Sequence, residues 1–217
     1  MISEKTVELN LTTELVNWIF SISKVRPYIL APSQREEGVW GYDVGLGGVS
    51  GRGVLLQFKR AYFTAPDEYE FKLNRTKYKD QHLRLQTLEG MGIPVYYVFP
   101  IFHTPNEVIT YRRRLLQKTI FVKPSRIKPK GGPVGHHEVV YKKTLDTWNV
   151  HSEEGVPIDY VEGIEEVYDE VQENSNSGAV SQIVKSCNSV YKNNKDSNSD
   201  EEDDYELFGS QSILVLN

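Results

Sequence analysis

The chain has 217 residues, of which 39% are hydrophobic and 25% are charged, and its formal net charge is −5 at pH 7. This length suits one domain with a substantial core plus extensions. No apolar run approaches the roughly 20 residues of a membrane helix, and the charged N-terminal residues do not resemble a signal peptide. The only cysteine, Cys187, has no partner for an internal disulfide. We therefore expect a cytoplasmic protein that makes no membrane contact.

Charge is distributed unevenly along the chain. Residues 1–150 contain 22 Lys and Arg against 14 Asp and Glu, a balance of +8. Residues 151–217 contain 3 against 16, a balance of −13. The first part is basic, as a phosphate-binding surface requires, and the acidic remainder is expected to behave as a separate unit.

The first predicted helix covers about 13–25, with Thr12 or Thr13 as its N-cap. Its apolar residues recur at helical spacing. The stripe expected to be buried consists of Leu15, Trp18, Ile19 and Ile22. A short extended segment over 28–31 follows and is ended by Pro32.

Two strands are predicted next, over 42–46 and 54–61, joined by a glycine-rich turn. A nucleotide-binding loop would open a helix, whereas this turn opens a strand. The apolar segment 94–100 is typical of a strand in a sheet covered on both faces. The other predicted elements are helices over 78–91 and 106–118 and short strands over 119–122 and 138–142.

This order of elements predicts an α/β fold over residues 1–150, a three-layer sandwich in which helices flank a mixed central sheet. Residues 151–173 are predicted to form an acidic helical extension, with an amphipathic helix over 158–171. Residues 174–217 are rich in Ser, Asn, Asp and Glu, so we expect a mostly disordered tail with a short apolar end. That tail could be autoinhibitory, could dock a partner, or could simply solubilise the chain.

Three polar residues stand out in the two predicted strands. Asp43 lies in the first, and Gln57 and Lys59 lie two positions apart in the second, so they point to the same face of a sheet. A carboxylate, an amide oxygen and an ammonium group on one sheet face can hold a hard cation and a water beside a phosphate. The structural alternatives are a turn Asp, a hydrogen-bonded strand Gln and a solvated Lys.

These residues also carry a resemblance to a known family. Asp43 and the pair Gln57 and Lys59 resemble the second and third motifs of the PD-(D/E)XK nuclease superfamily, in the variant with Gln in place of the last acid, as in Mrr-like nucleases. Tyr42 precedes Asp43, where the family usually has Pro. The resemblance covers roughly residues 12–100. It implies a restriction-endonuclease-like fold and hydrolysis of phosphodiester bonds with Mg²⁺ or Mn²⁺.

The resemblance also suggests roles for individual residues. Asp43 would bind the metal, Gln57 would contribute an oxygen, and Lys59 would polarise the attacking water. Glu14 on the first helix and Glu37 are two candidates for a further acidic ligand. Either acid could instead be an ordinary helix or loop charge.

Other residues could contact nucleic acid. Gln81, on the helix after the second strand, could position a phosphate or a metal-bound water, or could simply pack or lie on the surface. Basic residues that could bind the phosphate backbone, or could form a solvated face, are Arg112, Arg113, Lys123, Arg126, Lys128 and Lys130.

The leading functional prediction is therefore a Mg²⁺-dependent DNA endonuclease in prokaryotic or phage defence, restriction or repair. Two alternatives stay open. One is a protein of the same fold that binds nucleic acid or a partner without cutting it, and the other is a nuclease directed at RNA. An activating partner protein and a homodimer are both consistent with the resemblance.

Overall fold

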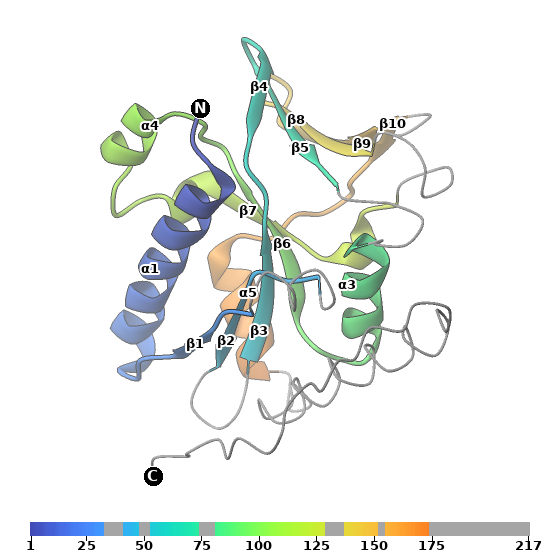
Figure 1. The fold of residues 1–217 in the computed structure, drawn as a ribbon. Helices are drawn as coiled ribbons and strands as arrows, with labels where there is room; N and C mark the ends of the chain where they lie inside the picture. The colour runs from blue at the N-terminus through green and yellow to red at the C-terminus, as the bar shows by residue number, and fades with distance from the viewer. Residues whose placement is uncertain (33–40, 48–52, 74–80, 129–136, 152–154, 174–217) are drawn as a thin grey trace, which may run out of the picture.

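The computed structural model describes six segments of the chain (Figure 1). They are residues 1–32, 41–47, 53–73, 81–128, 137–151 and 155–173. The candidate acid Glu37, the basic residue Lys130 and the predicted tail 174–217 lie outside these described residues. None of the helices in the described ranges combines the length and the apolar character that crossing a membrane requires.

The first sheet is mixed, as the sequence predicts. Its strand order is β1-β2-β3-β6-β7, in which β3 and β6 are parallel and every other pair is antiparallel. Its strands are β1 (Tyr28–Leu30), β2 (Val44–Gly47), β3 (Gly53–Phe58), β6 (Val95–Pro100) and β7 (Thr119–Val122). All five coincide with segments predicted to be extended, because their apolar runs are short and bounded by Gly and Pro.

Two separate hydrophobic clusters cover the two faces of this sheet. Residues alternate along β6, so Tyr96 and Val98 face one cluster while Tyr97 and Phe99 face the other. The helices α1 (Glu4–Ser23) and α5 (Ile164–Glu173) contribute to the first cluster. The helix α3 (Gln81–Gly90) and a second sheet contribute to the other. The result is a sheet with helices on both faces (Figure 1).

The second sheet is antiparallel throughout, with strand order β10-β9-β8-β5-β4. Its strands are β4 (Tyr62–Ala65), β5 (Glu68–Lys72), β8 (Glu138–Lys142), β9 (Thr147–His151) and β10 (Gly155–Pro157). Of these, β8 alone is predicted from the sequence. The alternation of acidic and aromatic residues in β5 is typical of a strand with one buried face.

An aromatic cluster joins the two sheets. Phe99 of β6 lies 4.8 Å from Phe71 of β5 and 5.9 Å from Trp148 of β9, measured between ring centroids. The Phe99 and Phe71 side chains are fully buried. Among the described residues, no strand is hydrogen-bonded into both sheets. The second sheet is therefore held against the first by ring packing.

The predicted bounds of the first helix are wrong. α1 begins at Glu4 and not near Thr13, because the Ser3 side chain caps it by accepting a hydrogen bond from the Thr6 backbone N–H. The buried stripe starts correspondingly earlier, with Val7 and Leu11 before Leu15. Ile22, predicted to be buried, is exposed in the last turn.

The helix predicted over 106–118 is also wrong. α4 spans only Pro105–Thr110, and Arg113 has a φ of 71°, which a continuing α-helix cannot accommodate. A short 3-10 turn, η2 (Leu116–Lys118), follows it and leads into β7. Similarly, the helix predicted over 158–171 begins later, at Ile164, because the preceding residues form β10 and a bridge between Glu162 and Phe121.

Candidate functional site

Asp43, Gln57 and Lys59 are brought together by the pairing of β2, β3 and β6. Asp43 lies one residue before β2, and its backbone N–H donates to the Leu56 carbonyl at 3.0 Å. Lys59 lies one residue after β3, and its N–H donates to the Val98 carbonyl at 3.1 Å. The alternation of β3 places Gln57 and Lys59 on the face of Leu55, which is the face covered by α3.

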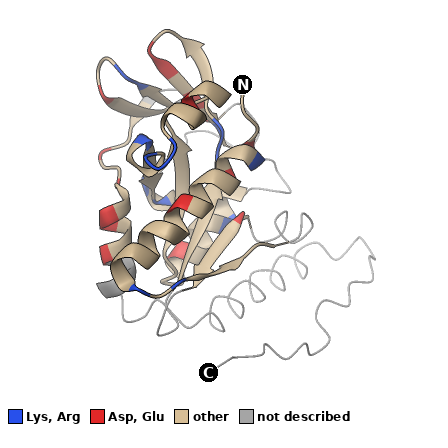
Figure 2. Cartoon of the chain, turned by 90° about the vertical axis from the view of Figure 1, so that its left-hand side faces the viewer, with Lys and Arg blue, Asp and Glu red and all other residues tan. Residues whose placement is uncertain are grey.

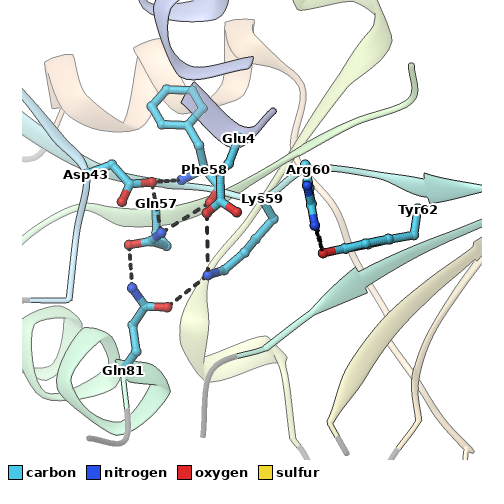
Figure 3. A network of polar contacts seen from close by, with 8 residues as sticks. All are labelled: Glu4, Asp43, Gln57, Phe58, Lys59, Arg60, Tyr62 and Gln81. Carbon is cyan, nitrogen blue, oxygen red and sulfur yellow. Dashed lines mark hydrogen bonds and ion pairs between the residues drawn. The ribbon is translucent and has the colours of Figure 1, made fainter. Parts of the chain in front are cut away.

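A chain of hydrogen bonds joins these residues to Gln81, the first residue of α3 (Figure 3). Lys59 Nζ donates to Gln81 Oε1 at 2.9 Å, and Gln81 Nε2 donates to Gln57 Oε1 at 2.8 Å. Gln57 Nε2 then donates to Asp43 Oδ2 at 2.8 Å, and this oxygen also accepts from the Phe58 backbone N–H at 2.7 Å. The four side chains therefore form one polar network.

This network is buried, and the charges at its two ends set the direction in which its hydrogen bonds are donated. Asp43 is 8% exposed, Gln57 1% and Lys59 3%, so each polar group would be costly to bury without a partner. Each amide turns its oxygen towards the ammonium end and its nitrogen towards the carboxylate end. The ammonium group of Lys59 is thus linked to the carboxylate of Asp43 through two oriented amides.

A glycine with a left-handed backbone conformation lies against the start of α3. Gly41 has a φ of 84°, in the region that favours glycine, and a Cβ there would lie 3.4 Å from Gln81 Cγ. Any other residue at this position would be strained by its backbone, although its Cβ would be in ordinary contact with Gln81.

A buried histidine fixes α3 beside Gln57. His82 Nε2 lies 3.0 Å from the Ile127 carbonyl, which can only accept, so this nitrogen carries the proton. The other nitrogen, Nδ1, then accepts from the Tyr97 hydroxyl at 3.2 Å. Tyr97 is the register partner of Gln57 on the neighbouring strand. The contact therefore sets the position of Gln81, the residue before His82, relative to Gln57.

The structure brings Glu4 to the network, and Glu14 lies elsewhere. Glu4 Oε1 lies 3.9 Å from Lys59 Nζ. Ten residues of α-helix span about 15 Å, so Glu14 lies far along α1 from that point. Its carboxylate accepts from the backbone N–H groups of Leu115 and Leu116, at 3.1 and 3.2 Å, and so satisfies the start of η2. The capping signal of Ser3 followed by Glu4 could have identified the earlier helix start.

The oxygen atoms near Gln57 fit a hard cation. Gln57 Nε2 lies between Asp43 Oδ2 at 2.8 Å and the Phe58 carbonyl at 3.2 Å. An electropositive N–H group thus occupies a position bordered by a carboxylate and a carbonyl, which are both ligand types that Mg²⁺ uses. Within the described residues, no group of three or more His, Cys, Asp or Glu side chains is arranged to hold a metal ion.

Two of the basic residues predicted to bind nucleic acid, Arg112 and Arg113, lie near a segment that packs on the α1 face of the first sheet. Arg112 and Arg113 are exposed and precede Leu115, which packs on the α1 face of the first sheet, opposite the face of Gln57 and Lys59. Figure 2 shows Lys and Arg interspersed with Asp and Glu on the side in view.

The basic residues after β7 lie closer to α3. Lys128 is exposed and follows Ile127, whose carbonyl contacts His82 next to Gln81. Arg126 is partly exposed, 3.7 Å from Glu162 Oε1 and 4.8 Å from the Tyr160 ring centroid. Lys123 Nζ lies 6.0 Å from the Tyr96 ring centroid.

Comparisons with known protein families, with curated proteins and with solved structures found no match. The chemical interpretation of the network therefore depends on the geometry of its own residues.

Proposed function

We propose that this protein is a metal-dependent endonuclease of the PD-(D/E)XK type that hydrolyses DNA phosphodiester bonds with Mg²⁺ or Mn²⁺. The observation that carries this proposal is the buried convergence of Asp43, Gln57 and Lys59 on one sheet face. Strands with polar residues are common, but a buried carboxylate, amide and ammonium linked from two strands and a helix are not needed to stabilise an ordinary sheet.

The restriction-endonuclease-like, three-layer form of the fold belongs to the same proposal. It is supported by the mixed first sheet and by the helices on its two faces. The second sheet packs on the same side as α3, where we propose that it is an addition to the core of the fold.

We assign each residue a role from its position. Asp43 binds the cation, held in orientation by the Phe58 N–H. Gln57 holds the Asp43 carboxylate in orientation for the cation by donating to it through its amide nitrogen, while its oxygen accepts from Gln81. Lys59 offsets phosphate charge and orients the attacking water, and Gln81 holds the Lys59 ammonium in place. When bound, the metal supplies Lewis-acid activation of water and stabilisation of the leaving oxygen.

The direct test is a cleavage assay with the full chain. Supercoiled plasmid, linear duplex, single-stranded DNA and RNA are incubated with Mg²⁺, with Mn²⁺ or with EDTA, and the products are resolved on gels. We expect nicked or linear DNA with either metal and intact DNA with EDTA. Cleavage of RNA alone would redirect the proposal to an RNA nuclease, and intact substrates in all metal conditions would overturn it.

Glu4 and Glu14 give a discriminating pair of variants. We expect Glu4→Gln to lower the cleavage rate by about tenfold or more and to raise the Mg²⁺ concentration needed for half-maximal activity, because Glu4 lies beside Lys59 at the network. Glu14→Gln should leave the Mg²⁺ dependence unchanged and lower only thermal stability, since Glu14 accepts from the backbone of η2. A metal titration of both variants measures this, and equal titration curves would contradict the assignment.

A second candidate function is a protein of this fold that binds nucleic acid without cutting it. It is favoured by one observation, the lack of a three-ligand metal group among the described residues. It predicts that DNA binding survives in EDTA and that no product forms with any metal. For either function we propose a setting in defence, restriction or repair. We also propose that the protein acts with an activating partner protein or as a homodimer.

A further inference from the structure

The chain that carries the network continues directly into a cationic and aromatic surface. Arg60 follows Lys59, and Tyr62 begins β4 two residues later (Figure 3). At about 3.3 Å per extended residue, Tyr62 lies about 10 Å along the chain from Lys59. Lys72, at the end of β5, reaches the same ring from the neighbouring strand.

Two cations meet at this single ring. The Arg60 guanidinium carbon lies 4.5 Å from the Tyr62 ring centroid, and Lys72 Nζ lies 4.8 Å from it. Arg60 Nε donates to the Tyr62 hydroxyl oxygen at 2.8 Å, and Arg60 Nη2 donates to the same oxygen. A hydroxyl has two acceptor lone pairs and one proton. With both lone pairs turned to Arg60, the Tyr62 hydroxyl proton is directed away from the guanidinium, where it can be donated to an anion.

These cations differ from others on the second sheet in their partners. Lys142, on the adjoining strand β8, forms an ion pair with Glu68 at 3.7 Å. Arg60 and Lys72 form no ion pair within 4.0 Å with any residue that the structure describes, and they are held instead by the Tyr62 ring. A π-face orients a cation without neutralising its charge. The two charges are therefore positioned and still able to bind an anion.

We propose that Arg60, Tyr62 and Lys72 bind the phosphate backbone of the nucleic-acid strand that leads away from the site at Lys59. This inference rests on the proposed function and adds the surface that positions the substrate. A guanidinium and a hydroxyl donor suit phosphate oxygens, and none of the three groups reads a base edge. The contact is therefore independent of base sequence.

Two acidic residues lie beside this surface. Glu70 is the register partner of Tyr62, and Glu138 is the register partner of Lys72 on β8. Burial, and next the neighbouring carboxylate of Glu138, raise the pKa of Glu70 above its usual value, and Lys72 opposes this. When Glu70 is ionised it repels a phosphate, so its removal should strengthen binding.

The experiment measures binding apart from cleavage. Fluorescence anisotropy is recorded in EDTA with labelled single-stranded DNA, duplex DNA and RNA, over a range of salt concentrations. The variants are Arg60→Ala, Lys72→Ala, Tyr62→Phe and Glu70→Gln, and the matched control is Lys142→Ala on the same sheet. Circular dichroism and thermal unfolding identify any variant that loses its fold, and Tyr62→Phe keeps the ring that packs on the surface.

We expect Arg60→Ala and Lys72→Ala to weaken binding by about tenfold each and to reduce the slope of log K against log salt by about 0.7 to 0.9. Tyr62→Phe should weaken binding to a lesser extent, Glu70→Gln should tighten it, and Lys142→Ala should leave it unchanged. Equal effects of Lys72→Ala and Lys142→Ala would overturn the inference, because general charge would then explain both. So would unchanged affinity in folded Arg60→Ala.

The two proposals fail in distinguishable ways. If the chain cuts no nucleic acid but the variants change binding as expected, the surface stands and the endonuclease proposal falls. If the chain cuts DNA and these variants bind and cut like the wild type, the endonuclease proposal stands and the surface falls.

Discussion

Asp43→Asn is expected to abolish metal-dependent cleavage, with a loss of at least about 100-fold to 1000-fold in rate. The variant keeps a side-chain oxygen that can accept from the Phe58 N–H, as Asp43 Oδ2 does at 2.7 Å. It removes the negative charge that would bind the cation. Rates are measured with plasmid DNA over a titration of Mg²⁺ and Mn²⁺, so that weaker metal binding and slower chemistry are separated.

The control for this variant is Asp159→Asn, which removes the charge of an exposed residue that is not part of the network. Because Lys59 is buried, loss of the Asp43 charge is also expected to lower stability, and thermal unfolding must show that Asp43→Asn remains folded at the assay temperature. A folded Asp43→Asn variant with the wild-type cleavage rate would refute the role of Asp43.

Phe99→Ala is expected to have the largest effect on stability. Phe99 is fully buried and contacts Phe71 and Trp148 of the second sheet. Removal of a buried phenyl ring costs about 3–5 kcal/mol, a large share of the about 5–15 kcal/mol that stabilises a typical domain. Urea denaturation followed by tryptophan fluorescence measures the loss, since Trp148 lies 5.9 Å from Phe99.

Two further variants make this result interpretable. Leu83→Ala on α3 removes a side chain that is 59% exposed, and it should change stability by no more than about 0.5 kcal/mol. Phe99→Leu should lower the free energy of unfolding by less than Phe99→Ala does. It replaces Phe99→Ala in the comparison if the alanine variant does not fold. A loss for Phe99→Ala no greater than that for Leu83→Ala would contradict a joint core of the two sheets.

The sequence predicts the first sheet well because its strands carry strong local signals. The short apolar run in β6 and the run in β3 that begins at a glycine each predict a strand from local sequence alone. The same alternation that predicts β3 places Gln57 and Lys59 on one face, and the structure confirms that arrangement. Asp43 follows because antiparallel pairing of β2 with β3 fixes its register.

The parts that sequence could not predict depend on contacts between distant residues. Glu4 approaches Lys59 only because α1 begins nine residues earlier than its strongest apolar spacing suggests, and Ser3 decides that start. The break after α4 follows from a positive φ at Arg113, a residue type that is common in helices. The second sheet combines strands from two regions of the chain, β4 with β5 and β8 with β9 and β10, and no local pattern specifies the pairing of β5 with β8 that joins them.

The linkage of Lys59 to Asp43 through two amides also bears on how this protein folds. In a site built from several carboxylates, the carboxylates repel one another until a metal ion binds. A chelator can therefore unfold a protein that contains such a site. Here an internal ammonium compensates the one buried carboxylate of the network, and every polar group between them has a partner. We therefore expect the chain to reach and keep its native form in a buffer poor in divalent ions, and we expect a chelator to stop the proposed cleavage reversibly while leaving the fold intact.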